Sequence, residues 1–189
     1  MRWTIFALFA LLAVVLDSSL TQVLTIRSLG WMTPSVTACL VVFISLFGTR
    51  FVALWSAWML GVVSDLLVVS VTEVGIVHMI GPHALGFLVG TAVILQLRSV
   101  VFRRRVLTFA LLTFVMMVSM TVTAAILAIA RDLAPWMSGE VIPVPGSHLG
   151  VGLAAAAYTA VLAFPLGWLL LASIDLWAFS MVQRRSIQW

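Results

Sequence analysis

Lysine is absent from this 189-residue chain, and charged residues of all kinds make up only 8% of it. Soluble domains carry roughly 25% charged residues, so the composition excludes a water-soluble globular fold. The single cysteine, Cys39, lies inside an apolar run, which leaves neither an intramolecular disulfide nor a cysteine metal cluster. Glycine and proline are scattered singly, without low-complexity tracts or the short alternating segments of an outer-membrane barrel.

Hydrophobic residues make up 63% of the chain, and its mean hydropathy is +1.23. These values predict an all-α integral membrane protein, because helices satisfy their own backbone hydrogen bonds in lipid. The first apolar run continues past Asp17 without an Ala-x-Ala cleavage site, so we interpret it as a retained helix rather than a signal peptide. We predict one domain, residues 1–189, with six transmembrane helices and a long outer loop at 131–148; the helices are expected near 3–25, 34–48, 51–71, 76–97, 106–130 and 149–177.

The arginines predict the orientation of these helices. Only Arg27 and Arg131 fall on one predicted side, and the remaining arginines fall on the other, which predicts cytoplasmic termini in a bacterial inner membrane. The net charge of +4 therefore reflects orientation, and no motif for nucleic acid accompanies it. A cytoplasmic basic cluster is predicted between the fourth and fifth helices and consists of Arg98, Arg103, Arg104 and Arg105. Three interpretations are open: the cluster determines the membrane topology, it attracts anionic lipid headgroups, or it binds an acidic partner protein.

Asp65 is the only charged residue in the apolar run 51–71, and a carboxylate at membrane depth should face protein rather than lipid. Gly61 lies one helical turn away on the same face, which favours a closely packed neighbour. Along their helices, Asp17 and Asp65 each lie about 21 Å from the cytoplasmic end, and His83 reaches a similar depth from the opposite direction. We therefore predict a buried polar layer of Asp17, Asp65 and His83, which serves either as structural hydrogen bonds or as a proton relay or ligand site.

No catalytic, metal or cofactor motif is present. The chain has no Gly-x-Ser-x-Gly, no His-Glu-x-x-His and no phosphate-binding loop, and its aspartates and histidines lack metal-ligand spacing. We expect no enzymatic activity and no cofactor. Small residues and a proline mark a predicted packing or partner interface, formed by Gly61, Pro82, Gly86 and Gly90; packing within the chain is the ordinary interpretation of such motifs.

The order of these motifs resembles the family of the rod shape-determining protein MreD. The likeness covers roughly residues 1–130 and rests on Leu20-Thr21-Gln22, Pro34, Gly48 with Arg50, Gly61-x-x-x-Asp65, Gly75, and Gly86-Phe87-Leu88-Val89-Gly90. Two features depart from the family pattern. Ser35 stands where members often have an acid, and the loop 131–148 is long for a connector.

The resemblance implies a non-catalytic membrane scaffold of the bacterial cell-elongation machinery. Such a protein would bind MreC and link the MreB cytoskeleton to peptidoglycan synthesis and cell shape, through a RodA-type glycosyltransferase and its transpeptidase. The family is also similar in fold to the substrate-binding subunits of energy-coupling-factor transporters. The alternative is therefore the substrate-binding subunit of a vitamin transporter, with an outward-facing pocket near Asp17, Asp65 and His83.

Overall fold

The computed structural model describes residues 3–25, 33–67, 70–72, 75–77, 81–99, 106–132, 149–174 and 176–177. These residues form six helices and one short antiparallel hairpin, in the order α1 (Trp3–Leu24), α2 (Val36–Phe47), α3 (Arg50–Leu67), β1 (Ser70–Thr72), β2 (Gly75–Val77), α4 (Pro82–Leu97), α5 (Val106–Asp132) and α6 (Leu149–Ala172). Within the described ranges, α3, α5 and α6 are long and apolar enough to cross a membrane. The fold thus fits an α-helical membrane protein.

The segment between α3 and α4 corrects the predicted boundaries. The helix predicted at 51–71 ends at Leu67, and the helix predicted at 76–97 begins at Pro82, because β1 and β2 lie between them. The sequence of this stretch is rich in β-branched residues, which favour strands over helices. Pro82 is therefore the first residue of α4, where a missing N–H costs nothing, and does not lie inside the helix as the predicted bounds 76–97 had it. The helix predicted at 149–177 ends at Ala172 and continues as turns.

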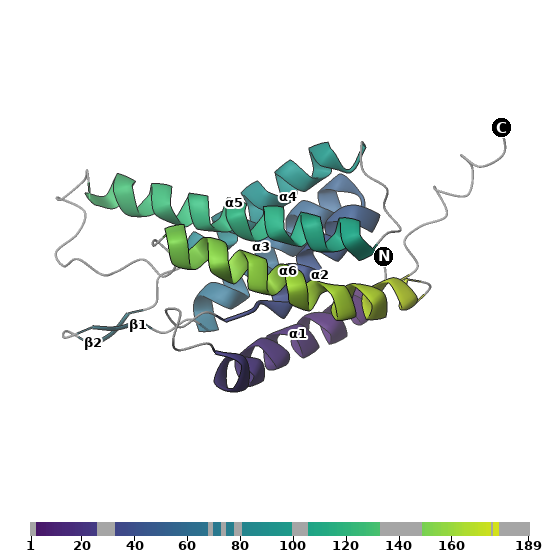
Figure 1. The fold of residues 1–189 in the computed structure, drawn as a ribbon, viewed down its shortest axis with the longest axis horizontal. Helices are drawn as coiled ribbons and strands as arrows, with labels where there is room; N and C mark the ends of the chain where they lie inside the picture. Colours follow the sequence, from purple (N-terminus) through teal and green to yellow (C-terminus); the bar gives the residue numbers. More distant parts are fainter. Residues whose placement is uncertain are drawn as a thin grey trace.

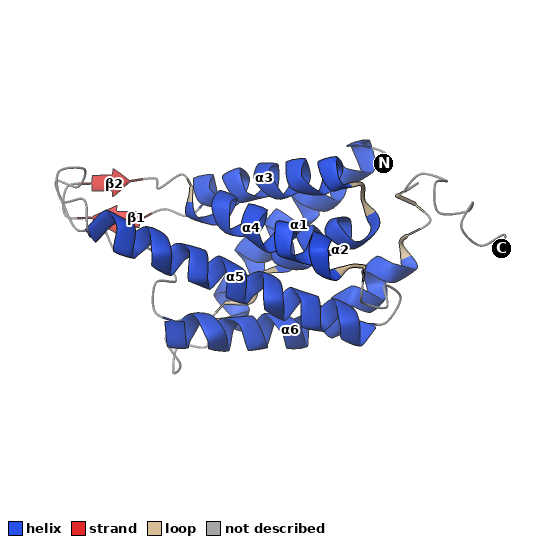
Figure 2. Cartoon of the chain, turned by 90° about the horizontal axis from the view of Figure 1, so that it is seen from above, coloured by secondary structure: helices blue, strands red, loops and turns tan. Residues whose placement is uncertain are grey.

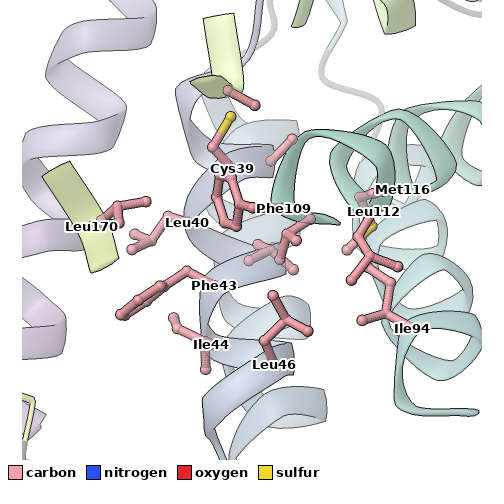
Figure 3. Packing of buried hydrophobic residues seen from close by; sticks show 14 of the residues in the cluster. Cys39, Leu40, Phe43, Ile44, Leu46, Ile94, Phe109, Leu112, Met116 and Leu170 are labelled. Atoms are coloured by element: carbon pink, nitrogen blue, oxygen red, sulfur yellow. The ribbon is translucent and has the colours of Figure 1, made fainter. Parts of the chain in front are cut away.

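Helix α2 forms the centre of the bundle. Every residue from Val36 to Leu46 is buried, as expected for a helix that is apolar on all sides and surrounded by other helices. Figure 3 shows side chains of α2, such as Phe43 and Ile44, packed among residues of the surrounding helices. These neighbours include Ile94 of α4, Phe109 of α5 and Leu170 of α6. The interior of the protein is thus filled by hydrophobic packing around one short helix.

The outer surfaces of the surrounding helices are apolar. Leu11 on α1, Phe51 on α3, Leu107 on α5 and Trp168 on α6 each expose more than 60% of their surface. A soluble protein would not expose contiguous apolar surface on this scale, whereas hydrocarbon is a suitable environment for it. Helices α5 and α6 lie side by side along the length of the bundle (Figure 1).

The two ends of the bundle differ in their residues. Helices α1, α3 and α5 run toward the end from which β1 and β2 project, and α2, α4 and α6 run away from it (Figure 2). We call this the hairpin end. The opposite end, where Arg50 begins α3 and Arg98 follows α4, is called the arginine end. Asp17, Asp65 and His83 all lie toward the hairpin end.

Candidate functional site

Asp65 binds the first turn of helix α4. Its Oδ2 accepts hydrogen bonds from the backbone N–H of Gly81 at 2.8 Å and of Ala84 at 3.2 Å. Its Oδ1 accepts from the backbone N–H of His83 at 3.0 Å and lies 2.7 Å from the His83 ring nitrogen Nδ1. The carboxylate is 1% exposed and accepts three backbone hydrogen bonds in addition to its contact with the His83 ring.

The local sequence explains why a carboxylate from another helix is needed at this point. Gly81 precedes α4 with φ of +137°, a conformation that favours glycine, and it has no side chain with which to cap the helix. Pro82 has no N–H, so the free donors of the first turn belong to Gly81, His83 and Ala84. Asp65 accepts from all three and places its negative charge at the positive end of the helix dipole.

Gly61 allows the two helices to come close enough for this contact. A Cβ added at Gly61 would overlap the backbone of Ala84, and it would lie 3.0 Å from the carbonyl oxygen of His83. Gly61 therefore faces α4, on which Asp65 also acts one turn further along. Gly61 and Asp65 therefore make one junction with α4.

Asp17 has an equivalent role at the start of helix α2. Its Oδ1 accepts from the backbone N–H of Val36, and its Oδ2 accepts from the N–H of Thr37 at 3.0 Å and from the Ser35 hydroxyl at 3.3 Å. Ser35 is the N-cap residue, and its Oγ also accepts from the N–H of Ala38 at 3.2 Å. The first three N–H groups of α2 are therefore all satisfied.

Arg98 binds the other end of helix α2. Its Nη1 donates to the carbonyl oxygen of Gly48 at 2.9 Å and to that of Ser45 at 3.4 Å. The central helix thus has a carboxylate at its N-terminus and a guanidinium at its C-terminus, the arrangement that its dipole favours. The sequence predicted Arg98 as part of a basic cluster with Arg103, Arg104 and Arg105, and the other three members lie outside the described residues.

A pocket of about 500 Å³, lined by both polar and apolar side chains and called the polar pocket below, lies between the two capped helix starts. Its polar walls come from α1, the start of α2, α3 and α4 and include Asp17, Ser18, Thr37, Ser64 and His83, while Phe87, Met117 and Met120 supply apolar surface. This volume lies within the range of roughly 300–1,000 Å³ that small-molecule sites occupy. Two of the three residues of the predicted polar layer, Asp17 and His83, line this pocket.

The structure brings Asp65 and His83 into direct contact and places Asp17 at the start of α2. Asp17 and His83 both line the pocket, and whether all three act as one polar layer stays a prediction. The described residues hold no group of three or more histidine, cysteine, aspartate or glutamate side chains that could bind a metal. Every buried side-chain nitrogen and oxygen in that part of the chain has a hydrogen-bond partner.

Two of the other predicted interface residues, Gly86 and Gly90, pack inside the chain. A Cβ at Gly86 would lie 2.9 Å from Met120 Cγ, and one at Gly90 would overlap the sulfur of Met116, both on α5. These glycines let α4 and α5 pack closely. The loop predicted at 131–148 lies outside the described residues from 133 onward.

Sequence reasoning missed that Ser35 caps α2 and that Ser35 and Thr37 both donate hydrogen bonds to Asp17. Ser35 directly precedes a long apolar run, and a serine in that position is a signal for the N-cap of a helix. It also missed the buried contact between Ser45 Oγ and Thr91 Oγ1 at 3.3 Å, which joins α2 to α4. No periodic pattern marks two hydroxyls that meet from different helices.

Comparisons with family models, with curated proteins and with solved structures found no match to the chain.

Proposed function

We propose that this protein is a non-catalytic, six-helix membrane scaffold of the bacterial cell-elongation machinery, as its resemblance to the MreD family implies. The supporting observation is the junction of Gly61 and Asp65 with the start of α4. The motif that carries much of the resemblance is the one that fixes this junction, through three backbone hydrogen bonds and a close helix contact. These groups hold two helices together, which is a structural role of the kind that a scaffold needs.

In this proposal all six helices cross the inner membrane, with both termini in the cytoplasm. The support is the distribution of arginine, because Arg50 and Arg98 lie at one end of the bundle and the two capping aspartates act toward the other. The arginine end is then cytoplasmic and the hairpin end periplasmic.

The proposed partners are MreC, the MreB filament, a RodA-type glycosyltransferase and its transpeptidase. MreC is expected to meet the protein within the membrane or at the hairpin end, because its coiled coil is periplasmic. The Gly86 and Gly90 face is already covered by α5, so a partner's helix would have to pack on the lipid-facing surfaces. Exposed residues of α1, α3 and α6 provide such surfaces, and examples are Leu11, Trp55 and Trp168.

Affinity purification from native membranes in mild detergent tests this proposal, with bound proteins identified by mass spectrometry. Recovery of MreC and peptidoglycan synthases is the expected result. A photo-crosslinking residue placed at Leu11, Trp55 or Trp168 should then capture MreC from at least one position, and the same residue at Phe43, which is fully buried in α2, should capture nothing. Absence of every elongation protein from the purified material would refute the scaffold.

The polar pocket favours a second candidate function, the substrate-binding subunit of a vitamin transporter. Its volume suits a small polar molecule, and hydroxyl, carboxylate and imidazole groups line it. Recovery of paired ATPases, a coupling membrane subunit or a bound vitamin would support this alternative. Ser64→Phe should then weaken binding of that vitamin at least tenfold by filling the pocket, while Val63→Phe, on the exposed side of α3, should leave binding unchanged.

A further inference from the structure

A second pocket, of about 460 Å³, lies at the arginine end between the first turns of α3 and the last turns of α4. Arg50, Arg98 and Gln96 are among its polar walls, and Ala92 and Leu95 are among its apolar walls. None of its described lining residues is acidic. It is separate from the polar pocket, because the two share no lining residue and lie at opposite ends of α3 and α4.

Polarity in this pocket changes with depth along the two helices. Arg50 is the first residue of α3, and Arg98 directly follows α4, so both guanidinium groups belong to the end of the bundle. Ala92 lies six residues before Arg98, about 9 Å deeper at 1.5 Å per residue. The pocket therefore offers cationic groups at its mouth and an apolar wall toward the middle of the bundle.

Arg98 is held in place by the fold. Its Nη1 donates to the carbonyl oxygens of Ser45 and Gly48, which fixes one side of the guanidinium at the end of α2. An arginine whose position is fixed loses less conformational freedom when it binds an oxyanion. Arg50 is exposed at the opposite wall and supplies the second charge.

We propose that this pocket binds an anionic phospholipid, with the headgroup phosphate between Arg50 and Arg98 and an acyl chain along Ala92 and Leu95. Planar guanidinium groups match the geometry of phosphate oxygens, and basic pockets between membrane helices are established sites for anionic headgroups. The apolar wall distinguishes a lipid from free phosphate, which would gain nothing from it. The surface beside the pocket is apolar too, because Phe51 is 71% exposed. This inference does not depend on the proposed scaffold function.

Native mass spectrometry of the full-length protein tests the site, with phosphatidylglycerol titrated in detergent against phosphatidylcholine. The wild type should retain phosphatidylglycerol preferentially. Arg50→Gln should weaken its binding about fivefold, the effect expected for one arginine near the headgroup, and Arg50→Lys should keep most of it. Ala92→Trp should also weaken binding, because it fills the apolar wall without changing the charge.

Two controls make the result specific. Leu85→Trp adds the same bulk to an exposed position of α4 outside the pocket and should leave lipid binding unchanged. Glycerol phosphate, added as a soluble headgroup, should not displace the lipid at millimolar concentration. The proposal is overturned if Arg50→Gln and Ala92→Trp both retain phosphatidylglycerol as the wild type does, or if glycerol phosphate displaces it completely, which would indicate a simple phosphate site.

Discussion

Replacing Asp65 tests whether this intramembrane carboxylate is a helix cap or one half of an Asp–His pair. Asp65→Leu leaves the backbone N–H groups of Gly81, His83 and Ala84 without their acceptor in a site that is 1% exposed at Asp65. An unsatisfied buried donor costs about 1–3 kcal/mol, so three of them cost about 3–9 kcal/mol. The three donors are neighbours in one turn, so their individual costs do not add in full, and we expect a loss of about 3 kcal/mol, near the lower end of that range.

The other substitutions at this junction separate the two interpretations. Asp65→Asn keeps one acceptor oxygen but turns an NH₂ group toward the second pair of donors, so about half of the loss for Asp65→Leu is expected. His83→Ala removes only the ring contact with Asp65 and should cost about 1 kcal/mol, the typical net value of one hydrogen bond. If Asp65 is a helix cap, the loss of unfolding free energy should increase with the number of backbone donors that each variant leaves unsatisfied. If Asp65 and His83 act as a catalytic or relay pair, no such order is expected.

The free energy of unfolding can be measured in mixed micelles by titration with SDS, followed by far-ultraviolet circular dichroism. Val63→Leu, on the exposed side of α3 close to Asp65, serves as the matched control and should match the wild type. The capping argument fails if Asp65→Leu lies within about 0.5 kcal/mol of the wild type, which is the usual range of surface substitutions.

Three further predictions concern the other helix ends and the glycine contacts. Ser35→Asp should lower the unfolding free energy, because Ser35 Oγ lies 3.3 Å from Asp17 Oδ2 and a second carboxylate there would repel the first. Asp17→Asn in the same chain should recover part of the loss, so the two changes should be non-additive in SDS titration. Arg98→Gln should lower it by about 1–2 kcal/mol by removing the cation at the C-terminus of α2, and Arg50→Gln, whose side chain is exposed, should have little effect in the same assay. Gly86→Val should cost about 1–3 kcal/mol through overlap with Met120, whereas Gly150→Ala, with nothing within 4 Å, should be neutral in thermal unfolding.

The sequence predicted the helical segments well because long apolar runs have few alternatives in a membrane. It also predicted that Asp65 and Gly61 share a face that meets another helix, since a buried charge and a missing side chain both require a protein neighbour. The donors for Asp65 were not predictable in the same way. They are backbone groups of Gly81, His83 and Ala84, and no residue type identifies a backbone N–H that lacks a partner.

The prediction left only residues 72–75 between α3 and α4, and it missed the strands β1 and β2 for a related reason. Hydropathy continues through Val71 and Ile76 and therefore does not distinguish a helix from a strand. The abundance of β-branched residues in this stretch was the available signal, and Pro82 was the second, because proline is favoured at the first position of a helix. Assigned in this way, the same residues predict the start of α4 that the structure has.

The lengths of helices α2 and α4 account for the two carboxylates that cap them. Helix α2 has 12 residues and α4 has 16, which correspond to about 18 Å and 24 Å, less than the roughly 30 Å of the hydrocarbon. In a proposed six-helix membrane arrangement, at least one end of each must lie below the membrane surface, where backbone N–H groups would otherwise have no acceptor. Asp17 and Asp65 supply that acceptor from the preceding helix in both cases. The polar pocket lies beside these two starts, so the same short helices account for both the buried charges and the space between them.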